Sequence, residues 1–264
     1  MYSKPFPQSI AEKIIGKPCV SDTVGESDST VLIFEDAVLK IELTNCNANH
    51  EYAALRWLQN RLPVPEILDF AQADGQNFLL MSKLRGAMAS DRIAESIEET
   101  VKALADGLQQ LWRVDISDCP LDSTLGERLQ QAKYNIENGL VDADDFEPET
   151  LGENGFADVH ALYDWLERAR PSADLVFTHG DFCLPNIFTE SGKAIGFLDL
   201  GKAGIADRWQ DIALCVRSLE HNICAFCALP KAEFLRAKNL LYAALGISED
   251  KEKLRYYILL DELF

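Results

Sequence analysis

The stretch that most constrains this chain runs from Val176 to Phe188, VFTHGDFCLPNIF, and is followed by a second acid at Asp199 within FLDLG. The residues LVFT have the composition of a buried strand, which ends in a turn that carries Asp181. The next segment, NIFTESGKAIGFLDLG, has the pattern of a β-hairpin with a Ser-Gly turn. Because a hairpin brings its two ends together, we expect Asn186 and Asp199 to be neighbours.

This spacing is typical of a kinase catalytic loop, in which H-x-D is followed by Asn and then by D-x-G. Amide and carboxylate oxygens are hard ligands that suit Mg²⁺ carried with ATP phosphates, so Asn186 and Asp199 are the predicted metal ligands. Asp181 remains free to accept a proton from a substrate hydroxyl and to orient it toward the γ-phosphorus. It is the predicted catalytic base. A single turn Asp more commonly binds only nearby backbone, and the three spaced residues together favour the kinase interpretation.

Two neighbours of this loop are interpreted in the same frame. His179 is expected to organise the loop through its ring and not to transfer protons. Asp211, in a helical segment farther along, is expected to brace the loop from beneath, with a surface ion pair to Arg208 or Arg217 as the alternative.

The nucleotide side is predicted from the N-terminal third of the chain. A polar turn containing Ser27 lies between two strand-like runs, where N–H groups and a hydroxyl can face phosphates. It has a lone glycine, so it is no G-x-G-x-x-G loop. Lys40 lies in the strand predicted over Ala37 to Ile41, where V-x-K resembles the lysine that reaches the α- and β-phosphates. A lysine there is more commonly a solvated edge residue, but Glu51, in the first turn of the next predicted helix, is available to pair with it.

The predicted fold is α+β, a two-lobed protein-kinase-like arrangement. EILDFAQADGQNFLLM indicates two strands around an Asp-Gly turn, and the chain then becomes mainly helical. We therefore expect an antiparallel-sheet lobe that binds nucleotide over residues 1–82, and a larger helical lobe for catalysis and substrate over residues 83–264. Backbone at the crossing, at Met81, Ser82 and Leu84, is predicted to bind the adenine edge. That assignment depends on the kinase interpretation.

The chain carries a formal charge of −18, with 43 acidic and 25 basic residues. Such a field repels nucleic acid and anionic membranes and attracts cations. No apolar run has the length of a membrane span. Seven cysteines, an odd number, indicate reduced thiols and a cytoplasmic location. Cys183 is expected to be a small packing residue and no nucleophile, and the pair Cys224 and Cys227, without a second ligand pair, is expected to pack as well.

Over nearly its whole length the chain resembles the bacterial aminoglycoside 3′-phosphotransferases. The resemblance is densest in LPVPEIL, DISDCP, LVFTHGD, NIF, FLDLGKAGIADRWQDIALCVRS and the terminal YYILLDELF. It implies transfer of the ATP γ-phosphoryl group, assisted by Mg²⁺, to an aminoglycoside hydroxyl at the 3′ position, which abolishes the antibiotic action. It also implies the phosphate-contacting role of Lys40 and the partner role of Glu51.

The same resemblance implies the substrate side. Asp261, Glu262 and the α-carboxylate of Phe264 would bind the ammonium groups of the drug, together with Glu147 from the acidic segment (residues 138–155). Lys202 stands where relatives have an arginine, which keeps the charge and loses the bidentate fork. The implied partner is a small cationic aminosugar, and the protein is expected to be a monomer or a weak dimer. A polycationic sugar agrees with the charge of −18.

Two alternatives remain open from the sequence. The first is a kinase of the same fold that phosphorylates choline, a macrolide or a metabolite alcohol. The second is a nucleotide-binding protein without catalysis, which the presence of all the predicted catalytic residues disfavours. The sequence does not distinguish 3′ from 5″ phosphorylation, or ATP from GTP.

Overall fold

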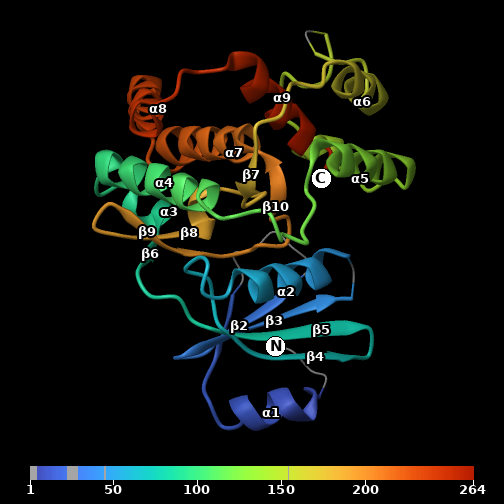
Figure 1. Cartoon of the computed structure of the whole chain (residues 1–264), viewed down its shortest axis with the longest axis vertical. Coiled ribbons are helices and arrows are strands. Elements are labelled where there is room, and N and C mark those ends of the chain that lie inside the picture. Colours follow the sequence, from blue (N-terminus) through green and yellow to red (C-terminus); the bar gives the residue numbers. More distant parts are fainter. Residues whose placement is uncertain (1–4, 23–28, 45, 154) are drawn as a thin grey trace.

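The computed structural model describes residues 5–22, 29–44, 46–153 and 155–264. Figure 1 shows two lobes joined by a narrow connection, with a small sheet lobe below a larger helical lobe. The predicted α+β, two-lobed fold is confirmed. Ser27 lies outside the described residues, so its predicted role stays a prediction.

The small lobe is one antiparallel sheet in the order β1-β2-β3-β5-β4. Helix α1 covers one face of the sheet and α2 lies on the other. The bounds are α1 Gln8–Ile14, β1 Val20–Asp22, β2 Thr30–Ile33, β3 Ala37–Leu43, α2 Cys46–Leu58, β4 Ile67–Ala73 and β5 Gln76–Ser82.

Strand β3 decides which way the predicted lysine points. Its side chains alternate, and Leu39 and Ile41 are buried in the apolar cluster that includes Ile10 and Ile14 of α1. Because successive strand side chains point to opposite faces, Lys40 projects from the other face, toward α2 and the large lobe.

Two predicted hairpins are confirmed. Asp74 and Gly75 join β4 to β5 with φ of 51° and 73°, and Ser191 and Gly192 join β8 to β9 with φ of 50° and 70°. Positive φ at both central residues is the tight turn that matches strand twist.

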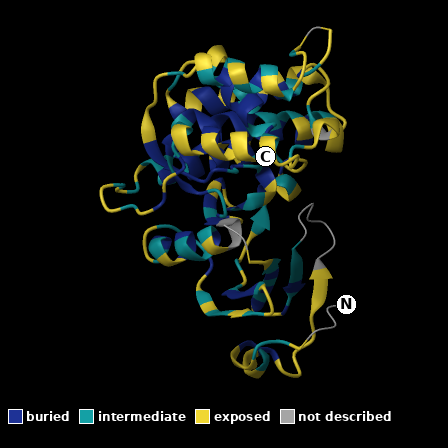
Figure 2. Ribbon diagram, turned by 90° about the vertical axis from the view of Figure 1, so that its right-hand side faces the viewer, coloured by how far each residue is buried: buried dark blue, intermediate teal, exposed yellow. Residues whose placement is uncertain are grey.

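The large lobe is built around α4 and α7, the two helices with most of their residues buried. Figure 2 shows that buried residues fill the interior of this lobe. Its helices are α3 Ala89–Arg92, α4 Ile97–Trp112, α5 Leu125–Glu137, α6 Val159–Arg168, α7 Arg208–Glu220, α8 Lys231–Leu245 and α9 Lys251–Asp261. Short 3₁₀ turns cover Ala143–Asp145 and Leu184–Asn186, and a π-helix covers His221–Phe226. Its strands are β6 Ala87–Met88, β7 Leu175–Thr178, β8 Ile187–Glu190, β9 Lys193–Phe197 and β10 Gly204–Asp207. Among the described helices none is both long and apolar enough to span a bilayer.

Ser123 is a residue type that often caps a helix, but α5 begins after Thr124, whose side chain makes no cap hydrogen bond. The Ser123 hydroxyl donates to the Lys202 carbonyl oxygen at 3.1 Å instead. This hydroxyl therefore contributes a contact within the large lobe and not a helix cap.

Candidate active site

The predicted catalytic loop leaves β7 at Thr178 and is held from below by α7. The carboxylate of Asp211 accepts hydrogen bonds from the backbone N–H of His179 at 2.7 Å and of Gly180 at 2.9 Å. Asp211 is fully buried, and burial raises its pKa from 3.8 to about 7. The bracing expectation is confirmed, and the alternative partners are occupied elsewhere: Arg208 pairs with Asp174 and Arg217 with Asp261.

Only glycine fits at position 180. Its φ is +81°, and a Cβ there would lie 2.0 Å from the Lys202 carbonyl oxygen. The loop that carries Asp181 therefore passes directly against the segment that follows Asp199.

Asp181 is held by its own loop. Asn186 donates through Nδ2 to the Asp181 carboxylate Oδ2 at 3.1 Å, and the Cys183 thiol donates to Oδ1 at 3.1 Å. The backbone N–H of Asp181 donates to Nδ1 of the buried His179 at 3.3 Å, which agrees with the organising role expected for that ring. Burial raises the pKa of the Cys183 thiol, so this residue is a donor and no thiolate.

The hairpin of β8 and β9 brings the two predicted metal ligands together. The Leu198 N–H donates to the Asn186 carbonyl oxygen at 2.9 Å, and Asp199 follows in the left-handed region with φ of 56°. The Asp199 side chain is 53% exposed, and its Oδ1 lies 3.1 Å from the Lys40 ammonium. Although burial acts against ionisation, Lys40 holds the pKa of Asp199 below its usual range.

Lys40 joins the two lobes through its charge. Its ammonium lies 2.9 Å from the Glu51 carboxylate of α2 as well as 3.1 Å from Asp199. Glu51 is only 3% exposed. Burial alone would lower the pKa of Lys40, but the surrounding carboxylates raise it above its ordinary value. The lysine is therefore fully charged, and the predicted strand–helix pair is present.

The first turns of α2 are tied to both lobes, which the sequence did not reveal. Asn49 accepts hydrogen bonds from Gln72 and Asn77 of the small-lobe sheet, each at 3.1 Å. The next residue, His50, lies with Nε2 2.6 Å from the Ala203 carbonyl oxygen in the large lobe. Because a carbonyl only accepts, this nitrogen carries the proton. The helix that presents Glu51 is thus positioned from both sides.

The predicted hinge is an extended crossing. The N–H groups of Ser82 and Lys83 donate to the carbonyl oxygens of Glu66 and Asp36, at 2.9 and 3.2 Å. The N–H of Leu84 has no backbone acceptor among the described residues, so it is available to a ligand. Met81 is buried. Its predicted contribution is therefore confined to its backbone.

On the predicted substrate side, Asp261 is already paired. It bridges Arg128 of α5, at 3.4 Å, and Arg217 of α7, and its side chain is 13% exposed. Burial opposes ionisation, but Lys202 and the two arginines hold the pKa of Asp261 below its usual range. The Arg128 guanidinium stacks 3.7 Å from the centre of the Phe264 ring, and the Lys202 ammonium lies 5.9 Å from it. No local sequence pattern indicated Arg128, because its partners lie more than a hundred residues away.

The acidic segment meets the last turn of the chain. The backbone N–H of Glu147 donates to the Glu262 carboxylate at 3.1 Å, and the Glu147 side chain is exposed. Burial raises the pKa of Glu262 from 4.5 to about 7. The structure therefore brings Glu147 and Glu262 together, and their role in binding the drug stays a prediction.

The donor set fits the predicted Mg²⁺. Asn186 uses its amide nitrogen within the loop, which leaves its oxygen directed away from those contacts, and Asp199 offers a half-exposed carboxylate. Mg²⁺ commonly takes one or two protein oxygens and completes its shell with water and phosphate. Among the described residues, no group of three or more His, Cys, Asp or Glu is arranged for a metal, so Cys224 and Cys227 are free thiols at the π-helix.

A paired strand lysine, a catalytic-loop acid and a metal acid in this two-lobed fold define a kinase-like phosphotransferase. The family model described as "Phosphotransferase enzyme family" matches residues 24–248, and the chain belongs to that family, within it to the aminoglycoside 3′-phosphotransferases. It is 38% identical to the aminoglycoside 3′-phosphotransferase of Enterococcus faecalis over 96% of each chain, and 36% identical to that of Staphylococcus aureus over 96% of each. It is therefore an enzyme.

Solved structures share the fold. The aminoglycoside phosphotransferase APH(3'')-Id from Streptomyces rimosus superposes with a TM-score of 0.84 at 23% identity, over 97% of this chain and 96% of that one. An aminoglycoside-3'-phosphotransferase of type VIII superposes with a TM-score of 0.74 at 27% identity, over 93% and 94%.

Asp211→Asn tests the brace. The substitution removes one of two charged acceptors for buried N–H groups, and we expect the free energy of unfolding to fall by about 2–3 kcal/mol, measured by urea denaturation. Asp174→Asn, at an exposed partner of Arg208, is the control and should change little.

Because the folded protein retains a proton that the unfolded chain releases between the ordinary pKa of 3.8 and about 7, the contribution of Asp211 to stability declines as pH rises through that window. A variant with an unchanged pH profile would contradict the assignment.

His50→Ala tests the tie between α2 and the large lobe. Loss of this hydrogen bond should loosen the Glu51–Lys40 pair and lower kcat/KM for ATP about tenfold, the equivalent of about 1.4 kcal/mol. His50→Gln keeps an N–H donor and should recover most of the loss. Arg56→Ala, on the exposed face of the same helix, should have no effect. Equal activities of the His50→Ala and His50→Gln variants would reject the role.

Proposed function

We propose that this enzyme transfers the γ-phosphoryl group of ATP to the 3′-hydroxyl of an aminoglycoside and thereby inactivates the antibiotic. The observation that carries the proposal is the convergence of Lys40, Asp181 and Asp199, which come from both lobes, with Asp181 next to Asn186 and Lys40 at 3.1 Å from Asp199. The relatives named above support the substrate class. The structure of the Streptomyces rimosus protein in complex with ADP and streptomycin, with a TM-score of 0.82, has the same fold.

The residues divide the work as follows. Lys40, oriented by Glu51, contacts the nucleotide phosphates, and the backbone of Met81, Ser82 and Leu84 binds adenine. Asp181, fixed by the amide of Asn186 and the thiol of Cys183, accepts the hydroxyl proton and directs the oxygen at the γ-phosphorus. Catalysis then depends mainly on positioning.

Asn186 and Asp199 would hold Mg²⁺. The ion supplies charge neutralisation on the phosphates when it is bound. Asp199, which pairs with Lys40 at 3.1 Å, would offer its carboxylate to the ion, and Lys40 would contact a phosphate oxygen.

The substrate side uses its carboxylates in two ways. Glu262 and the exposed Glu147 are available to drug ammonium groups. Asp261 is held by Arg128 and Arg217, so it contributes by fixing the last turn of the chain in place. Lys202, whose ammonium lies 5.9 Å from the centre of the Phe264 ring, and Phe264 are the remaining proposed substrate contacts. The formal charge of −18 supports attraction of a polycation.

The small lobe, residues 1–82, is the proposed nucleotide-binding unit, and residues 83–264 are the proposed catalytic and substrate-binding unit. We place the reaction in the cytoplasm, where ATP is available, which agrees with the six free thiols that the structure describes. A monomer or weak dimer suffices, because the proposed site is assembled within one chain. Nucleic acid is no partner for a chain of this charge.

The proposal is tested by ATP consumption with a panel of aminoglycosides that includes one without a 3′-hydroxyl. We expect turnover of the 3′-hydroxyl compounds and none of the deoxy compound, whose phosphorylation would reject the 3′ assignment. Asp181→Asn should reduce kcat by about 10²-fold or more, because general base assistance is typically of that size. Asp174→Asn, at an exposed ion pair, is the control. An unchanged rate in the Asp181→Asn variant would exclude this residue as the base.

The KM for the aminoglycoside should depend on pH through Glu262. Because burial raises the pKa of this carboxyl to about 7 in the free protein, it is protonated below that pH and gains its charge above it. An ammonium group binds the charged form, so KM should fall about tenfold between pH 6 and 8. Glu262→Gln should flatten the profile, whereas Glu153→Gln, an exposed acid of the acidic segment, should not. An identical profile in the Glu262→Gln variant would assign the titration to another group.

A further inference from the structure

Lys40 has a third carboxylate partner that the proposed reaction does not use. The Glu42 carboxylate Oε1 lies 3.1 Å from the Lys40 ammonium. The two residues are two positions apart on β3, so their side chains leave the same face of the sheet. Among the described residues, Lys40 is the only cation in an ion pair with Glu42. The Glu42 side chain is 21% exposed, so it borders solvent.

Three acids surround the lysine. Its ammonium donates hydrogen bonds to Glu51 and Asp199, at 2.9 and 3.1 Å, and forms a further ion pair with Glu42 at 3.1 Å. The formal charge of these four groups is −2, in the place proposed for nucleotide phosphates. A phosphate oxygen therefore has to displace carboxylates before it reaches Lys40.

Burial and the availability of other partners determine which carboxylates leave Lys40 when a phosphate binds. Glu51 is 3% exposed, and moving it off the lysine would leave an uncompensated buried charge, which is strongly unfavourable. Asp199 has Mg²⁺ as its proposed alternative partner. Glu42 has no second cation among the described residues, but it reaches solvent. Glu42 is therefore the carboxylate that leaves Lys40 for solvent without gaining another cation as a partner.

We propose that Glu42 competes with the nucleotide phosphates for Lys40, so that it weakens nucleotide binding and promotes release of ADP. After displacement it remains on the same strand, beside the phosphates, where like charges repel. When ADP leaves, Glu42 returns to the lysine and keeps it positioned for the next ATP. This inference rests on the proposed nucleotide role of Lys40.

Glu42→Gln tests the competition, because it keeps the shape and removes the charge. We expect the Kd for Mg·ADP, measured by calorimetry on the full chain, to fall about tenfold, and the KM for ATP to fall with it. The gain should shrink as salt rises, because a partly exposed charge is screened. Glu35→Gln, an exposed acid just before the same strand, makes the same change in net charge and should leave both constants within twofold.

Lys40→Met separates this inference from the proposed function. If that variant binds Mg·ADP as tightly as the parent, the lysine does not contact phosphates and the proposed nucleotide site is wrong. If Lys40→Met weakens binding while Glu42→Gln leaves it unchanged or weaker, the nucleotide site stands and the competition is rejected. Thermal melting of Glu42→Gln and of a second variant, Glu42→Thr, verifies folding. Tighter binding by both folded variants supports the proposal.

Discussion

One ammonium group, that of Lys40, connects the two lobes of this protein. The alternation of β3 turns the lysine away from the α1 side of the sheet, where Leu39 and Ile41 are buried. The hairpin of β8 and β9 brings Asp199 to it from the other lobe, at 3.1 Å. Glu51 and Glu42 of the small lobe offset its charge, but the proposed phosphate site also needs Asp199 of the large lobe, so the position of each lobe is part of the chemistry.

Local patterns in the sequence were sufficient for much of the site. Both hairpins were found because Asp-Gly and Ser-Gly turns are specified by adjacent residues. Glu51 was found because the helix that follows the strand of Lys40 was recognised, although α2 begins at Cys46, so Glu51 lies in its second turn and not in the first turn as predicted. Asp181, Asn186 and Asp199 are close in the chain, and a single hairpin makes them close in space.

Long-range partners were beyond such patterns. Arg128 is recognisable only once Asp261, 133 residues away, is next to it. His50 gains its meaning from a carbonyl oxygen 153 residues away, which no side-chain pattern encodes. Ser123 had the chemistry of a helix cap, but a carbonyl oxygen 79 residues along the chain accepts its hydrogen bond. Local sequence patterns indicate which groups can form hydrogen bonds or ion pairs, and the tertiary fold determines which of these interactions form.

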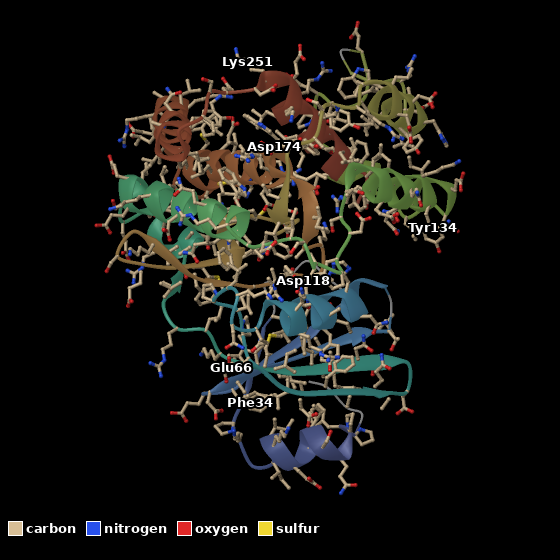
Figure 3. The ribbon with its side chains drawn as sticks, in the orientation of Figure 1. Phe34, Glu66, Asp118, Tyr134, Asp174 and Lys251 are labelled. Atoms are coloured by element: carbon tan, nitrogen blue, oxygen red, sulfur yellow. The ribbon has the colours of Figure 1, made fainter. Side chains whose placement is uncertain are left out.

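The attachment of α2 at Ala203 has a consequence for how the molecule moves. Besides the covalent crossing after Ser82, the lobes are joined by the His50 bond, by Phe197 N–H to the Pro63 carbonyl oxygen at 3.0 Å, and by Arg61 to Asp118 at 2.9 Å, near the label in Figure 3. Because these contacts lie at separate points of the interface, the small lobe cannot rotate about the crossing alone without breaking them. Nucleotide exchange in this enzyme should therefore involve rearrangement of side chains while the two lobes keep nearly the same relative position. Its rate should depend more on individual ion pairs than on rotation of one lobe away from the other.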